Sequence, residues 1–202
     1  MLLAFDTSSA ACTAALFERG QCIARKDEMI GRGHSERLVP MIAELLEERS
    51  ATHILVGVGP GSFTGIRVAI AAAHGLAIGW GAELCGMSSL ALLAAGAESQ
   101  GEVAAAVAGG HGELFVQQFA AMTAEPTFEL RNLTPAEAAK ITTASLVIGS
   151  GAKALVEARG TGDARDAWPS AADALKLPLA LRTLPAKPVY ARAPDARVKE
   201  AA

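Results

Sequence analysis

The stretch HILVGVGPGSFTGI, residues 53–66, decides the fold. Its apolar first half predicts a buried strand, its glycines predict a tight turn, and the Ala-rich sequence that follows predicts a helix. Ser62 or Thr64 can cap that helix through its hydroxyl. A glycine turn at a helix N-terminus can bind an anion, but the lysine of a Walker loop is missing, and Pro60 replaces the first glycine of a nucleophile elbow. The stretch alone therefore allows two interpretations, a structural turn or a phosphate site.

The N-terminal residues strengthen the case for a phosphate site. Residues 1–9, MLLAFDTSS, form an apolar run that ends in Asp6 and a row of hydroxyls. Two further apolar runs, 12–17 and 21–26, predict strands that complete an antiparallel meander. A strand that carries Asp-x-x-Ser/Thr into a hairpin is similar to the start of actin, acetate-kinase and sugar-kinase folds, in which the hydroxyls lie near the phosphates of a nucleotide.

Five segments of the chain resemble one known family. They are Asp6–Ser8, His34–Glu36 at a helix start, the turn Gly57–Arg67, Gly86–Leu90, and Pro188–Arg192 near the C-terminus. On these motifs the chain is similar to the TsaB (YeaZ) family, densely over residues 1–95 and thinly after them. The resemblance implies an α/β fold with two lobes of the actin/sugar-kinase-like (ASKHA, RNase H-like) type, in which mixed sheets are flanked by helices.

The resemblance also implies a function. Members of the family are non-catalytic subunits that activate a TsaD-type catalytic paralogue, which threonylcarbamoylates the adenosine next to the anticodon in tRNAs that read ANN codons (t6A). A TsaE-type ATPase joins the pair, and tRNA binds through the complex. The chain is thus expected to be cytoplasmic, to have no enzyme activity alone, and to leave ATP and metal to its partner subunits. It is expected to form a heterodimer, or a homodimer when the partner is absent.

A nucleotide site is an open question in the sequence. The candidate residues are Asp6, Thr7, Ser8, Gly149 and Gly151. The first three resemble the phosphate side of an actin-type kinase, and the two glycines resemble its adenosine side. Tight strand-to-helix turns need glycine whatever they bind, so these residues can equally be relics of the fold. The family usually carries Asp-Ala-Arg where this chain has Ala108-Gly109-Gly110, which removes an acid and an arginine from the second lobe.

Other chemistries have little support in the residues. The catalytic paralogue uses paired histidines on one helix, whereas the histidines of this chain, at positions 34, 53, 74 and 111, are too far apart to share a helical turn. No metal site is therefore predicted. A glycoprotease-type peptidase would need an activated nucleophile, and an independent ATP-binding kinase-like protein would need a catalytic acid in its cleft. Both remain as alternatives to the tRNA-modification subunit.

Composition and charge set wider limits. The chain has 202 residues, of which 51% are hydrophobic and 4% aromatic, so its core must be built from Ala, Leu, Val and Ile. The net charge of −3 gives no overall attraction for nucleic acid, although Arg182–Lys199 is rich in Lys and Arg. This basic segment is either a solvated tail or a phosphate contact within a larger complex. Cys12, Cys22 and Cys85 lack disulfide or metal spacing. The apolar run 68–82 is shorter than the ~20 residues of a membrane span, so none is predicted.

The order of predicted elements divides the chain into two lobes. Residues 1–98 form the first, with the meander, helices over 35–49, 62–80 and 88–97, and strands over 52–58 and 83–86. Residues 99–202 form the second, with strands over 103–108, 113–120, 127–130 and 146–149, a capped helix after Thr134, a helix to Ala158, a loop over 160–166 and a last helix over 170–182. The last helix and the tail can return to the first lobe.

Helices 35–49 and 62–80 are apolar over more than one stripe. Because one apolar face is enough to cover a sheet, the surplus predicts association with another protein. Small residues at four-residue spacing in the second helix would let a partner helix approach closely. The resemblance implies that both helices pair with those of the catalytic paralogue as a four-helix bundle. The expected interface residues are Leu38, Met41, Ile42, Leu45, Ile66, Ala69, Ile70 and Ala73.

Overall fold

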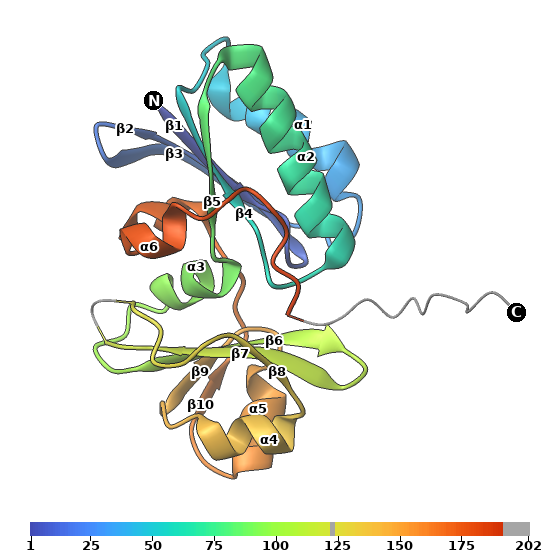
Figure 1. Ribbon diagram of the computed structural model, residues 1–202, viewed down its shortest axis with the longest axis vertical. Helices are drawn as coiled ribbons and strands as arrows, with labels where there is room; N and C mark the ends of the chain where they lie inside the picture. Colours follow the sequence, from blue (N-terminus) through green and yellow to red (C-terminus); the bar gives the residue numbers. More distant parts are fainter. Residues whose placement is uncertain (122–123, 192–202) are drawn as a thin grey trace, which may run out of the picture.

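The computed structural model describes residues 1–121 and 124–191. Two sheets lie one above the other, with a pair of helices on the outer face of each and further helices in the space between them (Figure 1). The first sheet consists of β1 (Leu2–Asp6), β2 (Ala11–Glu18), β3 (Gln21–Met29), β4 (His53–Gly57) and β5 (Glu83–Met87). Its outer face is covered by α1 (His34–Leu46) and α2 (Phe63–Trp80), and α3 (Ser89–Ala95) lies on its inner face.

The second sheet forms the other lobe. It consists of β6 (Val103–Gly110), β7 (Glu113–Phe119), β8 (Arg131–Leu133), β9 (Leu146–Ile148) and β10 (Asp163–Arg165). Its outer face is covered by α4 (Pro135–Ile141) and α5 (Ala152–Arg159). Helix α4 begins with the capping box that the sequence predicts, because Thr134 and Glu137 bond to each other's backbone N–H.

The two sheets have the same topology. The strand orders are β3-β2-β1-β4-β5 and β8-β7-β6-β9-β10. In each sheet the first three strands are antiparallel, the fourth pairs in parallel with the first, and the fifth pairs in parallel with the fourth. Each lobe is thus a mixed sheet flanked by helices, as the sequence predicts.

The first sheet is buried on both faces in its centre, which explains why its strands appear in the sequence as continuous apolar runs. In β1, Leu3 and Phe5 pack under α1 and α2, whereas Ala4 belongs to the core between the two sheets. Successive side chains of a strand point to opposite faces, so one strand serves both layers.

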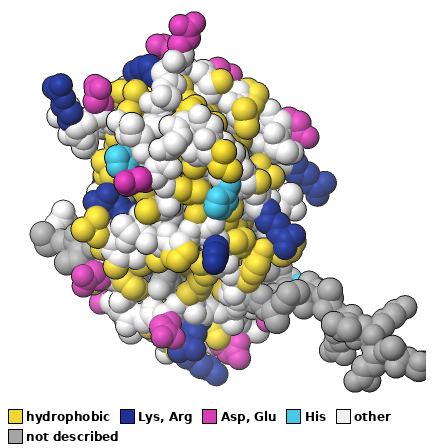
Figure 2. All heavy atoms as spheres, turned by 45° about the horizontal axis from the view of Figure 1, so that its top comes forward, with side chains coloured by type: hydrophobic (Ala, Val, Ile, Leu, Met, Phe, Trp, Pro, Cys, Tyr) yellow, Lys and Arg dark blue, Asp and Glu magenta, His cyan; other side chains and the backbone are white. Residues whose placement is uncertain are grey.

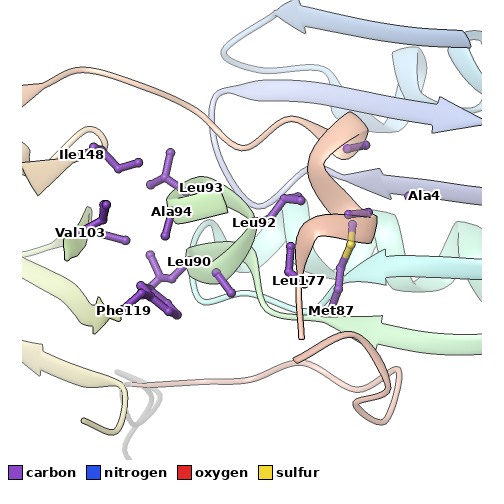
Figure 3. Close-up of a cluster of buried hydrophobic side chains, with 14 of the residues drawn as sticks. Ala4, Met87, Leu90, Leu92, Leu93, Ala94, Val103, Phe119, Ile148 and Leu177 are labelled. Carbon is purple, nitrogen blue, oxygen red and sulfur yellow. The ribbon is translucent and has the colours of Figure 1, made fainter. Parts of the chain in front are cut away.

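Helix α3 is the centre of the core between the lobes (Figure 3). Its Leu92 lies toward Leu177 and Met87 on the side of the first sheet, and its Leu93 lies toward Ile148 on the side of the second. All five of these residues are 2% exposed or less. This shared core holds the lobes in one arrangement.

After β10 the chain returns to the first lobe. The 3₁₀ helix η1 (Ala171–Lys176) and the short helix α6 (Leu179–Arg182) precede an extended segment beside β5. There Leu184 exchanges two backbone hydrogen bonds with Gly86, at 2.6 and 3.0 Å. Further on, the N–H of Val189 donates to the carbonyl of Val58 at 2.9 Å.

A buried threonine fastens η1 to the first sheet. The hydroxyl of Thr13 donates to Asp27 at 2.5 Å and accepts the N–H of Ala171 at 2.7 Å. Ser170 also donates to Asp27, at 3.0 Å. Thr13 is 1% exposed, so its hydrogen bonds are shielded from water.

One strand prediction and one loop prediction in the second lobe are wrong. The strand expected over 127–130 begins later, at Arg131, because the pairing with β7 is interrupted after Thr127, and the side chain of Gln117 donates to the carbonyl of Phe128 at 3.2 Å. The loop expected over 160–166 contains β10, which extends the sheet by pairing with β9.

The last predicted helix, over 170–182, is also wrong as a continuous element. Pro178 lacks a backbone N–H and cannot continue a helix from the preceding residues. The segment therefore divides into η1 and α6, and Leu177 between them is extended.

The hydrogen bonds of Thr13 generate a stability prediction. Thr13→Val keeps the shape of the side chain but leaves the buried N–H of Ala171 without its acceptor, which costs about 1–3 kcal/mol. The free energy of unfolding from a urea titration should fall by that amount. Thr161→Val, in an exposed loop, is the matched control and should change it by less than about 0.5 kcal/mol. Equal stabilities of the two variants would contradict the assignment.

Candidate functional site

The carboxylate of Asp6 lies at the end of β1 and is fully buried. Its Oδ1 accepts the N–H and the hydroxyl of Ser8, both at 2.6 Å, and its Oδ2 accepts the hydroxyl of Ser89 at 2.5 Å. The Ser89 oxygen in turn accepts the N–H of Gly59 at 3.1 Å. Asp6 therefore links β1, the N-terminus of α3 and the glycine turn before α2.

The glycine turn lies directly against the end of β1. A Cβ at Gly57 would lie 1.8 Å from Oδ2 of Asp6, and one at Gly65 would lie 1.9 Å from the carbonyl oxygen of Thr7. Both distances are far shorter than a van der Waals contact, so only glycine fits at these two positions. The hydroxyl of Thr7 also donates to the carbonyl of Gly65, at 2.7 Å.

Three amides of this turn, at Gly59, Ser62 and Gly65, donate to groups inside the protein. The N–H of Ser62 donates to the carbonyl of Ser8 at 2.6 Å. The Ser62 hydroxyl accepts the N–H of Gly65 at 3.2 Å and so caps α2, as predicted. These geometries account for the glycines by close packing, without a phosphate.

The second candidate turn is likewise explained by packing. A Cβ at Gly149 would lie 2.4 Å from the carbonyl oxygen of Ala106, and Gly149 has a φ of +114°. The N–H of Gly151 donates to that same carbonyl at 3.0 Å. Both glycines thus lie under β6, and Ser150 between them faces the space between the lobes.

A cleft of about 710 Å³ separates the two turns. Ser8, Ser9 and Ser62 line it from the first lobe, and Ala108, Gly109 and Ser150 from the second. Of the five residues predicted for a nucleotide site, only Ser8 lines the cleft; the structure brings the two predicted segments to opposite sides of it. The short Ala108-Gly109-Gly110 segment, where the family usually has an acid and an arginine, is part of its wall.

The lining of the cleft also includes aromatic residues that were not among the predicted site residues. Phe63 and Tyr190 stack with ring centroids 5.3 Å apart, and both line it. The guanidinium of Arg67 lies 3.6 Å from the centre of the Phe63 ring and donates to the Tyr190 hydroxyl at 3.0 Å. Trp168 lines the same space from the segment before η1. No local pattern connects these residues, because they are up to 127 positions apart.

A charged cluster fastens α1 to β3. Arg37 bonds to Glu28 at 2.5 Å and to Glu44 at 2.7 Å, and Lys26 also contacts Glu44. These cations lower the pKa of Glu44 to about 2, with Arg37 as the larger cause. Arg37 likewise lowers the pKa of Glu28 through a hydrogen bond. Elsewhere, burial raises the pKa of the Cys12 thiol to about 11, which makes it a poor nucleophile.

Over 1–121 and 124–191, no three His, Cys, Asp or Glu side chains lie close enough to hold a metal ion. The basic residues Arg192, Arg197 and Lys199, which the sequence analysis considered for a phosphate contact, lie outside the described residues.

The eight residues predicted for a partner interface are all buried. Leu38, Met41, Ile42, Leu45, Ile66, Ala69, Ile70 and Ala73 lie in the core under α1 and α2. Their side chains are at most 9% exposed, so most of their surface covers the first sheet. Gly65, Ala69 and Ala73, which are small residues at four-residue spacing in α2, are buried as well, and a Cβ at Gly65 would collide with the backbone of Thr7.

The exposed residues of the two helices are different ones. Ile78 is 84% exposed and Val39 is 51% exposed. Helix α2 is long and apolar enough to cross a membrane by length and composition, with a mean hydropathy of 1.3, yet only 28% of its residues are buried. Its inner face packs on the sheet, as in the core helix of a globular protein, and its outer face is left uncovered.

Two lobes of one topology, on either side of a cleft, place the chain in the actin/sugar-kinase-like class of proteins, as predicted. The profile of the family described as "TsaD: tRNA N6-adenosine threonylcarbamoyltransferase" matches residues 27–154. The chain belongs to this family, in the branch whose members are named TsaB or YeaZ.

Curated relatives and solved structures agree with this assignment. The chain is 38% identical over 101 residues to the tRNA threonylcarbamoyladenosine biosynthesis protein TsaB of Escherichia coli, covering 48% of this chain and 43% of that protein. It is 40% identical over 98 residues to TsaB of Haemophilus influenzae, covering 46% and 41%. The chain thus spans less than half the length of the curated relatives that it matches.

The structural matches extend over the whole fold. A Pseudomonas aeruginosa protein described as similar to peptidase YEAZ has a TM-score of 0.80 and 29% identity, covering 95% of this chain and 99% of that one. YeaZ from Pseudomonas aeruginosa has a TM-score of 0.77 at 29% identity, with 94% and 98% covered. The predicted family and fold are confirmed.

The contact between Gly57 and Asp6 generates the second prediction. In Gly57→Ala the new Cβ would overlap the buried carboxylate and break its hydrogen bonds, so stability should fall by about 3 kcal/mol. Gly75→Ala is the matched control, because nothing lies within 4 Å of the Cβ that it adds on an exposed turn of α2. It should raise stability by about 0.5–1 kcal/mol. Thermal unfolding of both variants should show a lower stability for Gly57→Ala and a higher one for Gly75→Ala. An unchanged stability of Gly57→Ala would contradict the close contact between Gly57 and Asp6.

Proposed function

We propose that the chain is a non-catalytic subunit that pairs with a TsaD-type threonylcarbamoyltransferase and activates it. The pair would modify the adenosine next to the anticodon in tRNAs that read ANN codons. The observation that carries the proposal is the uncovered apolar face of α1 and α2. The names of the TsaB relatives, which assign those proteins to threonylcarbamoyladenosine biosynthesis, support the pathway.

The outer face of α1 and α2 has the composition of an interface. Its exposed apolar and small residues are Val39, Pro40, Ala43, Ala71, Gly75 and Ile78. Figure 2 shows hydrophobic side chains spread over this side of the molecule, between scattered charged and histidine side chains. Apolar surface mixed with polar groups is typical of protein–protein contacts.

The geometry suits helix-on-helix packing. Ala71 and Gly75 are one turn apart on the exposed side of α2, which allows a partner helix to approach closely. A partner that contributes two helices would complete a four-helix bundle and bury about 800 Å² on each chain. When the catalytic paralogue is absent, the same face would pair with a second copy about a two-fold axis.

The composition of the cleft supports a division of labour in the complex. Over the described residues, the cleft lining includes no Lys, Arg, Asp or Glu. An independent kinase would need a cation for the phosphates and an acid for the acceptor hydroxyl, so this alternative has no support in the cleft. ATP and metal would then bind to the catalytic paralogue and to a TsaE-type ATPase that joins the pair. The complex would act on tRNA in the cytoplasm.

The proposed function is tested by reconstitution. The purified chain, the TsaD-type and TsaE-type proteins of the same bacterium, threonylcarbamoyl-adenylate and tRNA are mixed, and modified adenosine is measured by mass spectrometry. Modification should require the chain, whereas the chain alone should produce none. Turnover by the chain alone, or full activity without it, would contradict the proposal.

A single variant tests the interface in the same assay. Ile78→Lys adds a charge to the apolar face and should weaken binding to the TsaD-type protein at least tenfold, because the ammonium would lose water on docking. Modification should fall in parallel. Ile141→Lys, at a 43% exposed isoleucine that ends α4 in the other lobe, is the control and should bind normally. A folded Ile78→Lys chain that binds like the control would place the interface elsewhere.

A further inference from the structure

A groove of about 390 Å³ runs along α2, far from the cleft. Its second wall is the return segment, residues 184–191, which passes beside β5 and α2 (Figure 1). Because β5 is the outermost strand on this side of the sheet, the groove lies on the side of α2 that faces away from α1. The lining residues are His74, Ala77, Ile78, Ala82, Leu84, Ala186 and Lys187.

The two walls of the groove carry positive charge and no carboxylate. Residues 59–82, which contain α2, and residues 174–191, which contain the return segment, have no Asp or Glu. Their Lys and Arg residues are Arg67, Lys176, Arg182 and Lys187. A carboxylate that enters the groove would therefore meet an ammonium at Lys187 and no like charge from either wall.

The ammonium of Lys187 has no carboxylate partner within the described residues. The acidic residue next to the groove in the sequence is Glu83, in β5. Successive side chains of a strand point to opposite faces, and Leu84 packs in the core under α1 and α2. Glu83 thus points to the other face, where its carboxylate lies 3.3 Å from Nε2 of His53. Lys187 is exposed and available to a partner.

Contacts between α2 and the return segment hold the two walls in place. Nε2 of His74 lies 3.4 Å from the carbonyl oxygen of Ala186, and Arg67 donates to the hydroxyl of Tyr190 at 3.0 Å. The wall that carries Lys187 is thus fixed beside α2 before a partner binds. A surface that is already ordered loses less conformational freedom on association.

We propose that this groove receives an acidic side chain of the protein that docks on the outer face of α1 and α2. Its carboxylate would pair with Lys187, and its methylene groups would lie against Ala77 and Ile78. Ile78 is 84% exposed and belongs to both the groove and that face, so the two surfaces are continuous. This pairing rests on the proposed function and adds one feature of the partner's chemistry. A charge pair at the margin fixes the orientation of the docked helices.

Charge variants of Lys187 test the pairing by calorimetry with the TsaD-type protein. Lys187→Arg keeps the charge and should bind normally. Lys187→Ala should weaken binding about threefold, as for a partly exposed ion pair. Lys187→Glu should weaken it at least tenfold, because the reversed charge repels the partner's carboxylate. Added salt should weaken binding of the unmutated chain more than that of Lys187→Ala.

Two further variants serve as controls, and every variant must first show a normal thermal transition. Lys140→Glu makes the same charge change at an exposed lysine in the last turn of α4, in the other lobe, and should bind normally. Ala71→Phe adds bulk to the exposed side of α2, outside the groove lining, and should weaken binding at least tenfold whatever the charge at Lys187.

The outcomes separate the groove from the interface. If Ala71→Phe weakens binding but Lys187→Glu binds like Lys140→Glu, the pairing is overturned and the interface on α1 and α2 stands. If neither Ala71→Phe nor Lys187→Glu weakens binding, the interface is overturned as well. If Lys187→Glu binds the TsaD-type protein normally but dissociates a dimer of this chain in sedimentation, the groove belongs to a second copy and the pairing is overturned.

Discussion

The buried carboxylate of Asp6 is the constraint on which the first lobe depends. It joins the end of β1 to α3 through Ser89, and Ser89 joins both to the turn before α2 through the N–H of Gly59. Three elements that are distant in the sequence therefore meet in one cluster. Because Gly57 and Gly65 permit direct contact with β1, α2 has a single position on the sheet. In that position, one apolar face of α2 packs on the sheet and the other points away from it.

The carboxylate of Asp6 and the N–H groups of Gly59 and Ser62 bond to groups inside the protein. Over the described residues, the cleft beside them is bounded by small, aromatic and uncharged residues. The chain has the two lobes and the cleft of this fold class, and the described lining of the cleft includes no Lys, Arg, Asp or Glu. This supports the proposal that the chain contributes surface and position to a complex, and that catalysis belongs to its partner.

The sequence was sufficient for the parts of the fold that depend on local chemistry. The cap at Ser62, the capping box at Thr134 and the strand that ends in Asp6 follow from residue type and spacing. The strands β8 and β10 are three residues long and have no alternating pattern, so their pairing depends on tertiary contacts. The site was harder to predict. Helical periodicity identifies a buried stripe but does not say whether the sheet or a partner covers it, and in α1 and α2 the predicted stripe lies mostly on the sheet. Trp168 and Tyr190 come together only in three dimensions.

The most direct test of this account is amide hydrogen exchange of Gly59 and Ser62, measured by NMR with and without Mg-ATP. If their N–H groups are bonded to Ser89 and Ser8, exchange is slow in the free chain and does not change when Mg-ATP is added. Fast exchange in the free chain, with protection that appears only in the presence of Mg-ATP, would contradict the account. In that case the turn would be a working phosphate site.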